Sequence, residues 1–363
     1  MKILLLTGDS SLTGAPLHVL QLATNFLKLK HDVMVISPPG KLINLCQEAK
    51  IDCHKIRMKG PFDWGAVRNI EKKLKEFKPD IAHFHGTRGG WLGRIACRKI
   101  DTKVIYTEHL WTENFRLKNL AYQNFQLRGL KFLDRYSDAT IAVSKAVYDF
   151  LIKHGYDKNK IYIIPNGIPS RYVESKTIAK PKDVPFIVGT VGSLNYVKNH
   201  QGAIKAISIF LKNNPDANVH LQIVGDGPLK KSLQRLTRRT GISEKIQFTG
   251  RVEDVLERLQ HFQIFLSLSL SESFGMAVGE AMAVGLPVIA SNIKALRYLV
   301  DGAGILANPH DHKKVAKEIE KLYKDSKKQN KLGALSKKRI RENFSEEKLV
   351  QKTIELYTNL LKG

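Results

Sequence analysis

The segment from Ser271 to Ser291, SESFGMAVGEAMAVGLPVIAS, contains two carboxylates whose spacing is suited to ligand binding. It predicts a serine-rich loop after a buried strand, and then a helix that begins near Gly275 and stops at Gly285. In open α/β sheets, ligands bind at such loop-to-helix junctions, and the free N–H groups of the helix start favour phosphate. Glu272 and Glu280 flank this turn, so their carboxylates could accept hydrogen bonds from sugar and ribose hydroxyls.

The ordinary alternative is a pair of solvated glutamates on a surface helix, because glutamate is a common residue. Gly275 and Gly279 argue against it, since glycines at a helix start let the backbone approach a ligand closely. The segment therefore predicts a phosphate- and sugar-binding turn.

Short apolar runs alternate with longer amphipathic stretches along the chain, and this rhythm indicates parallel sheets with crossover helices. It stops in a stretch rich in proline and lysine and then restarts, which predicts two doubly wound α/β domains. We expect an N-terminal domain over residues 1–170, a linker over 171–185 and a C-terminal domain over 186–343. A final helix over 344–363 should pack back towards the N-terminal domain. The expected strands are Lys2–Leu6, Asp32–Ile36, Ile81–His85, Lys103–Thr107, Ala139–Val143 and Ile161–Ile164, then Phe186–Val191, Val219–Val224, Lys245–Phe248, Ile264–Ser267 and Pro287–Ala290; the clearest helices are Leu17–Leu29 and Trp64–Phe77.

The Glu-x7-Glu spacing followed by AMAVGLPVIAS resembles the donor-site signature of retaining family-four glycosyltransferases of the GT-B fold. The other motifs of that family follow in order along almost the whole chain. They are TGAPLHVLQLA (13–23), HFHG (83–86), YTEH (106–109), VSKAV…IYIIPNGI (143–168), VGSLNYVKNH (191–200), IVGDGP (223–228) and FTGRVED (248–254). Each motif alone is weak, but their joint order is specific.

The resemblance implies a role for individual positions. Three residues would be catalytic. Lys198 would contact the diphosphate of the donor, Glu272 would contact the 3- and 4-hydroxyls of the sugar, and His109 would lie beside the sugar. Glu280 would bind the ribose. The remaining donor-binding positions would be Gly14, Ala15, Ser193, Gly225, Arg251, Val252, Asp254, Ser273, Phe274, Gly275 and Met276. For His109, and more so for His83 and His85, the alternative is a purely structural contact.

Three positions depart from the pattern of the family. Ser193 stands where many relatives have an arginine, which leaves Lys198 with more of the phosphate charge to neutralise. Ala15 replaces the second glycine of the acceptor-side loop, and Tyr298 stands where a glutamate is frequent. The inference about the acceptor is therefore the weakest part of the resemblance.

The chain contains no Asp-x-Asp motif, with which another common class of nucleotide-sugar enzyme holds a divalent ion. We therefore expect no metal and no cofactor, with Lys198, a helix dipole and backbone N–H groups acting on the leaving group. The IVGDGP segment lacks the Lys-Ser/Thr of a phosphate-binding ATPase loop. We predict transfer of a hexose or N-acetylhexosamine from a UDP- or GDP-sugar to a hydroxyl acceptor, such as a lipid-linked or cell-envelope glycan. Asp254 or Glu253 could read guanine, which favours GDP slightly.

Two other functions remain open at this stage. One is an epimerase-like GT-B enzyme, which would turn over the nucleotide sugar without an acceptor. The other is a basic nucleic-acid-binding protein, suggested by a net charge of +25 from 59 Lys+Arg against 34 Asp+Glu. The sequence has no helix-turn-helix pattern, aromatic RNA-binding pair or clustered basic tail, so we expect no nucleic-acid partner.

The basic charge also suggests contact with an anionic membrane surface. Three cysteines without metal or disulfide spacing, and no apolar run of about 18 residues, predict a cytoplasmic protein without a spanning helix. Ten Lys/Arg and five Asp/Glu lie between Lys41 and Lys78, while Trp111 to Arg135 interleaves basic residues with aromatics. Peripheral attachment to the cytoplasmic face of the membrane is one reading. The other is that these aromatics face the core and the lysines are simply solvated.

Overall fold

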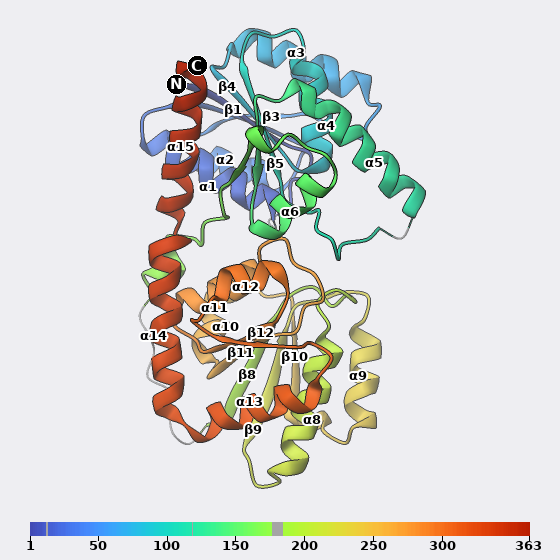
Figure 1. Cartoon of the computed structure of the whole chain (residues 1–363), viewed down its shortest axis with the longest axis vertical. Coiled ribbons are helices and arrows are strands. Elements are labelled where there is room, and N and C mark those ends of the chain that lie inside the picture. The colour runs from blue at the N-terminus through green and yellow to red at the C-terminus, as the bar shows by residue number, and fades with distance from the viewer. Residues whose placement is uncertain (12–13, 118, 176–183) are drawn as a thin grey trace. The chain divides into compact units, whose positions relative to one another are not determined.

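The computed structural model describes residues 1–11, 14–117, 119–175 and 184–363. It consists of two compact units (Figure 1). Unit 1 contains Met1–Gly167 together with Glu346–Gly363, and unit 2 contains Ile168–Ser345. Each has its own buried apolar core, so each is described by itself below.

Unit 1 is built around a seven-stranded parallel sheet with strand order β3-β2-β1-β4-β5-β6-β7. Its central strands are mostly apolar and are buried on both faces, as a sheet covered by helices on both sides requires. The strands are β1 (Lys2–Thr7), β2 (Asp32–Ser37), β3 (Asp52–Lys55), β4 (Ile81–His85), β5 (Lys103–Glu108), β6 (Ala139–Ala142) and β7 (Ile161–Ile163). The helices are α1 (Ala15–Lys28), α2 (Lys41–Glu48), α3 (Trp64–Phe77), α4 (Gly86–Cys97), α5 (Leu120–Leu133), α6 (Lys145–Lys153) and α15 (Glu346–Lys362).

Unit 2 repeats this design with a six-stranded parallel sheet of order β10-β9-β8-β11-β12-β13. The strands are β8 (Phe186–Val191), β9 (Val219–Val224), β10 (Ile246–Gly250), β11 (Ile264–Ser267), β12 (Val288–Ser291) and β13 (Ile305–Ala307). The helices are α7 (Ser170–Val173), α8 (His200–Asn213), α9 (Lys230–Arg239), α10 (Val255–His261), α11 (Met276–Ala283), α12 (Lys294–Val300), α13 (His312–Lys324) and α14 (Ser326–Asn343). In both sheets the strand order reverses beside the first strand, the place where doubly wound sheets bind ligands.

The predicted fold class, two Rossmann-like parallel-sheet domains of the GT-B type, is confirmed. The expected strands all occur, with ends that differ by two residues at most. Two edge strands were not predicted. In β3 all four residues are exposed or half-buried, and β13 is only three residues long. Neither therefore has the continuous apolar run by which a buried strand is recognised.

The division into units differs in detail from the predicted domain borders of 170/171 and 343/344. Unit 2 begins at Ile168, whose N–H donates to the carbonyl of Phe344 (2.7 Å). The predicted linker over 171–185 includes part of helix α7, which belongs to unit 2, while residues 176–183 lie outside the described residues. Helix α15 belongs to unit 1, where Leu356 and Tyr357 lie in the core that α1 helps to form.

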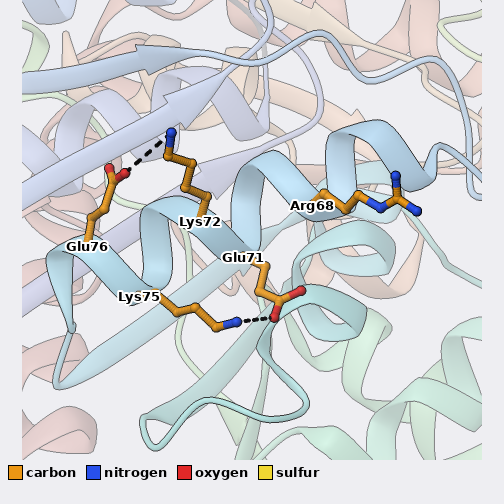
Figure 2. Close-up of a pocket in the computed structure, with 5 residues that line it drawn as sticks. All are labelled: Arg68, Glu71, Lys72, Lys75 and Glu76. Atoms are coloured by element: carbon orange, nitrogen blue, oxygen red, sulfur yellow. Dashed lines mark hydrogen bonds and ion pairs between the residues drawn. The ribbon is translucent and has the colours of Figure 1, made fainter.

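The basic stretch around α3 forms a solvated surface in which acids neutralise the lysines. Figure 2 shows a shallow hollow on this helix, where Lys75 pairs with Glu71 (2.6 Å) and Lys72 with Glu76 (3.9 Å). Such i,i+4 pairs stabilise an exposed helix by a few tenths of a kcal/mol. Glu76 also pairs with Lys73 (2.8 Å), so the two acids of α3 offset part of its positive charge.

The stretch from Trp111 to Arg135 divides between core and surface. Trp111 and Leu130 are buried, as the structural reading expected. Leu120, Phe125 and Phe132 are exposed apolar side chains on α5, a helix without any acidic residue. Across the described residues, no helix combines the length and the hydropathy that crossing a bilayer would require.

Candidate active site

The start of α11 presents unpaired backbone N–H groups, as the sequence predicted. Gly275 precedes the helix with φ of 102°, and no side chain caps the N–H groups that follow. A Cβ at Gly275 would lie 2.5 Å from Leu296 Cδ2, so both the backbone angle and the space require glycine. The buried ring of Phe274 packs edge-on against Phe344, with ring centroids 5.7 Å apart. This anchor fixes the turn and leaves the N–H groups from Met276 onwards available to an anion.

Lys198 and Glu272 form an ion pair next to this turn. Lys198 Nζ donates to Glu272 Oε1 (2.6 Å), and their side chains are only 25% and 13% exposed. The aliphatic part of Lys198 lies over Gly192, where a Cβ would come within 3.3 Å of it. Its backbone N–H donates to Asn195 Oδ1 (3.1 Å), which fixes the loop. The structure thus brings together two of the three predicted catalytic residues, 74 positions apart in the chain.

The glycines after β8, β9 and β10 let three loops pack closely at the carboxyl edge of the unit 2 sheet. Gly225 has φ of +138°, and a Cβ there would lie 2.0 Å from the carbonyl oxygen of Gly192. The N–H of Gly225 also donates to the carbonyl of Gly250 (2.8 Å). The predicted donor-binding residues Arg251 and Val252 follow directly in sequence. Gly225 therefore sets the close approach of these loops.

Four other predicted donor-binding residues lie at the surface or form local hydrogen bonds. Ser193 is exposed and its hydroxyl accepts from Asn195 Nδ2 (2.9 Å). Ser273 is half-buried and Arg251 is exposed. Asp254 Oδ1 accepts from the N–H of Leu256 (3.0 Å), so this carboxylate caps helix α10.

Glu280 lies in α11 as a half-buried carboxyl without a counterion at bonding distance. Within the described ranges it has neither a hydrogen-bond nor an ion-pair partner for its side chain. Burial raises the pKa of Glu280 to about 7, although the positive charges of Arg171 and Lys198 oppose this shift. A carboxyl kept from water without a partner is suited to accept hydrogen bonds from a ligand.

Arg171 is a candidate site residue that the sequence reasoning missed. It lies in the short helix α7, in the segment interpreted as linker. Its guanidinium acts electrostatically on Glu280, lies 3.8 Å from Asp254 Oδ1, and donates to the hydroxyl of Tyr172 (3.0 Å). Only the order of helices in the fold places this cation beside α11, so no local pattern could have identified it.

In unit 1, the predicted residue His109 belongs to a cluster of histidines. His109 follows β5, and its Nε2 lies 3.3 Å from Nδ1 of His85 at the end of β4. The ring of His18, from the first turn of α1, lies 4.9 Å from that of His109 and 5.3 Å from that of His85. His83 stacks on His85 at 3.9 Å between ring centroids. The HFHG and YTEH motifs thus meet with α1 at the carboxyl edge of the unit 1 sheet.

These rings are uncharged near neutral pH. Burial, which disfavours the protonated form, lowers the pKa of His18 to about 4 and the pKa values of His85 and His109 well below 6.5. His83 has a structural role, because Nδ1 bonds to the Tyr357 hydroxyl and Nε2 to the Thr107 hydroxyl, each at 2.6 Å. The alternative of a structural contact is therefore correct for His83.

A buried network under the loop after β5 fixes the position of His109. The carboxyl of Glu108 accepts from the hydroxyl of Tyr106 (2.6 Å) and from the N–H groups of Leu110 (2.7 Å) and Trp111 (3.2 Å). Burial raises the pKa of Glu108. The backbone on both sides of His109 is thereby tied to one side chain.

The two predicted acceptor-loop residues stand at the start of α1. Gly14 precedes the helix with φ of 58°, Ala15 is its first residue, and no side chain caps it. Ala15 therefore leaves a helix start of the same kind as that of α11. Of the motif around them, residues 12 and 13 lie outside the described residues. The departure at Tyr298 has a packing explanation, because its ring meets Phe344 edge-on at 5.6 Å.

Two family models match consecutive parts of the chain. "Glycosyltransferase Family 4" matches residues 12–171, and "Glycosyl transferases group 1" matches residues 173–339. The chain is a glycosyltransferase of the GT-B type. The two matches to this glycosyltransferase follow one another along the chain in the same order as the family motifs in its sequence.

The relatives of this glycosyltransferase include enzymes whose names contain a lipid-linked acceptor or a lipid product. It is 27% identical, over 82% of its length and 80% of the relative's, to the UDP-Gal:alpha-D-GlcNAc-diphosphoundecaprenol alpha-1,3-galactosyltransferase of Escherichia coli. It is 26% identical to the alpha-monoglucosyldiacylglycerol synthase of Acholeplasma laidlawii, over 77% and 76% of the two chains. The crystal structure of HepE from Anabaena in complex with UDP has the same fold, with a TM-score of 0.85, 20% identity, and coverage of 99% and 100%.

Proposed function

We propose that this glycosyltransferase moves a hexose or N-acetylhexosamine from a UDP-sugar to a hydroxyl of a lipid-linked or cell-envelope glycan, with retention at the anomeric carbon. The observation that carries the proposal is the Lys198–Glu272 pair beside the uncapped start of α11. A cation and free N–H groups suit a diphosphate, and a neighbouring carboxylate suits sugar hydroxyls.

The chemical step that we propose is a front-side displacement. The acceptor hydroxyl bonds to the anomeric carbon as the bond from that carbon to the diphosphate oxygen breaks, and its proton passes to the departing phosphate. Lys198 and the N–H groups at the start of α11 stabilise the charge on the leaving group. A double displacement would need a second carboxylate near the sugar as nucleophile. The sequence motifs assign Glu272 alone to that place.

We propose UDP rather than GDP as the nucleotide. One of the two carboxylate oxygens of Asp254, Oδ1, already caps α10, which leaves this side chain fewer positions for accepting from guanine. The Escherichia coli relative names UDP-Gal as its donor, and HepE is a complex with UDP. Calorimetric binding of UDP and GDP to the full chain tests this choice. At least tenfold tighter binding of UDP is expected, and tighter binding of GDP would overturn it.

We propose that the reaction needs no metal ion. Lys198 and the start of α11 offer positive charge to the diphosphate, and the sequence has no Asp-x-Asp motif. Treatment with EDTA should leave the rate of transfer unchanged. A rate that falls with EDTA and returns with Mg²⁺ or Mn²⁺ would contradict the proposal.

We also propose that the acceptor is reached at the cytoplasmic membrane surface through α5. This helix exposes Leu120, Phe125 and Phe132 and contributes the positive charge of Arg128, while its Lys131 lies 3.9 Å from Asp134 just beyond the helix. Exposed Phe62 extends the apolar surface, because its ring lies 5.7 Å from that of Phe125. Aromatics insert at headgroup depth, and each basic side chain near an anionic leaflet contributes about 1 kcal/mol.

Cosedimentation with liposomes tests the membrane surface. Binding to anionic vesicles should exceed binding to neutral vesicles and fall with salt. The variant Phe132→Ser/Arg128→Gln should bind at least about fivefold less, because it removes an exposed aromatic and a charge worth about 1 kcal/mol. The matched control Lys72→Gln, on the neutralised surface of α3, should bind like the wild type. Equal binding to anionic and neutral vesicles at low salt would contradict the proposal.

A donor screen is the decisive experiment for the function. The full chain is incubated with UDP- and GDP-sugars, with and without polyprenyl-diphosphate sugars or diacylglycerol, and thermal stabilisation and nucleotide release are measured. Stabilisation by one UDP-sugar and acceptor-dependent release of UDP are expected, both impaired in Glu272→Ala. Conversion of the donor to its epimer without an acceptor would support the epimerase-like alternative instead.

A further inference from the structure

Three of the clustered histidines in unit 1 bring ring nitrogens to one point. One nitrogen each from His18, His85 and His109 lies within 4.8 Å of the other two. The closest measured pair, His85 Nδ1 and His109 Nε2, is 3.3 Å apart. Two nitrogens bound tetrahedrally to Zn²⁺ at 2.0–2.1 Å lie about 3.3–3.4 Å apart, so this spacing already matches that of metal ligands.

We infer that His18, His85 and His109 form a binding site for a divalent transition metal of the Zn²⁺ class, with three imidazole ligands and an open fourth position. Neutral imidazole is a preferred ligand of Zn²⁺, Cu²⁺ and Ni²⁺, whereas Mg²⁺ and Ca²⁺ prefer oxygen. The site therefore selects the first group of ions.

The hydrogen bonds of the cluster also favour a ligand. His18 Nδ1 is a buried ring nitrogen without a hydrogen-bond partner in the described part of the chain. An unpaired buried polar atom is costly, and binding a ligand removes that cost. His83 is excluded as a ligand, because Tyr357 and Thr107 engage both of its nitrogens.

The scaffold around the cluster supports coordination. His85 is the last residue of the central strand β4, and His109 follows its neighbour β5, so the sheet fixes both backbones. His109 is half-buried while His85 is fully buried, so an ion can enter from the side of His109.

The metal would act as an inhibitor of transfer rather than as a cofactor. This consequence, unlike the binding itself, rests on the proposed function together with the family resemblance, which implies that His109 lies beside the sugar. An ion held by His109 would occupy the place of the sugar or the acceptor. Micromolar Zn²⁺ should therefore slow transfer, and a chelator should restore it, while a chelator alone leaves the rate unchanged.

The test measures binding of the metal to the chelator-treated full chain without donor or acceptor. Calorimetry with Zn²⁺ should give one tight site, and Co²⁺ should produce the visible absorption of a tetrahedral complex. The variants His18→Gln, His85→Gln and His109→Gln should each weaken binding at least about tenfold, since even outer-shell changes cost 10–100-fold. The control His54→Gln, at a histidine of β3 paired with Asp52, should bind like the wild type.

A further variant guards against loss of folding. His109→Cys keeps a metal ligand, so it should retain Co²⁺ binding and add a sulfur-to-metal charge-transfer band. Circular dichroism and the melting temperature report whether each variant is folded. The inference is overturned if the wild type binds Zn²⁺ no more tightly than the folded His109→Gln variant, or if His54→Gln loses as much affinity as the cluster variants. Because no transfer is measured, these outcomes do not depend on the donor or the acceptor.

Discussion

The two sheets present opposite chemistry at their carboxyl edges. Unit 1 gathers uncharged ring nitrogens from His18, His85 and His109, whereas unit 2 gathers charges in the Lys198–Glu272 pair. Burial accounts for the difference. The imidazole of His85 is fully buried, and the carboxyl of Glu108 bonds to Tyr106 and to a backbone N–H group. Lys198 is a quarter exposed and pairs with the carboxylate of Glu272. The comparison teaches that the charged groups for a diphosphate belong to unit 2, while unit 1 offers neutral donors and acceptors.

Removing the cation of unit 2 should give the largest effect. Lys198→Ala should lower kcat about 100-fold, because a preorganised charge on a leaving group contributes a few kcal/mol to the transition state. Ser193 offers no arginine nearby to compensate. Steady-state kinetics measure the effect, with Lys321→Ala as the control, since that lysine pairs with Glu318 on the exposed side of α13. A loss of less than threefold would assign the phosphate charge to another group, with Arg171 as the next residue to replace.

The second prediction concerns how the stability of the folded chain depends on the protonation of Glu280 in unit 2. The pKa of Glu280 is about 7 in the folded chain and about 4.5 when unfolded, so the folded state holds the proton more tightly. Stability should therefore decrease as pH rises from about 4.5 to 7, by an amount on the order of 2 kcal/mol. Glu280→Gln should remove this part of the pH dependence and be the more stable chain at pH 8. Urea unfolding of both chains at pH 5 and 8, without nucleotide, measures it; identical pH dependence would contradict the raised pKa.

The third prediction concerns the same residue in the presence of the donor. Glu280→Ala should weaken binding of the nucleotide diphosphate about tenfold, because ribose contacts exist before the transition state. The value corresponds to the loss of one charge-assisted hydrogen bond. Calorimetry provides the measurement, and Glu318→Ala on α13 provides a control within the same unit. If the affinity is unchanged while kcat falls, Glu280 acts on the sugar rather than the ribose.

The fourth prediction is that the ring of His109 does not titrate near pH 6.5, as an ordinary histidine would. Because the pKa of His109 is well below 6.5, its ring should stay neutral from pH 8 down to pH 6. Its nitrogen chemical shifts should therefore be constant over that range in NMR of the ¹⁵N-labelled chain, assigned through His109→Gln. A midpoint near pH 6.5 would mean that unit 1 can also carry positive charge, and the contrast between the two sheets would fail.

The sequence predicted the local features of the site better than the contacts between distant residues. The glycines around Gly275 fixed the start of α11, since turn and helix signals act within a few residues. The pairing of Lys198 with Glu272 spans two loops, so only the family resemblance suggested it. Arg171 was missed because its segment shows no periodicity.

The histidine cluster was predictable only in part. The alternation of side chains along β4 puts His83 and His85 on one face, which the HFHG motif allows to be inferred. The approach of His109 depends on the register of β4 with β5, and that of His18 on the packing of α1. Register and packing arise from the whole sheet, so no local pattern distinguished the structural His83 from the other three.

The return of α15 to unit 1 determines when each unit can fold during synthesis. Unit 2 is one continuous segment, Ile168–Ser345, and can fold as soon as it has left the ribosome. Unit 1 is interrupted by it and waits for the last residues, because Tyr357 fills the core beside Phe26 and bonds to His83. A nascent chain that ends before α15 therefore leaves an apolar face and a buried histidine without their partners. A premature stop in α15 would thus damage the N-terminal sheet first, and unit 2, which begins later in the chain, would be the first to be complete.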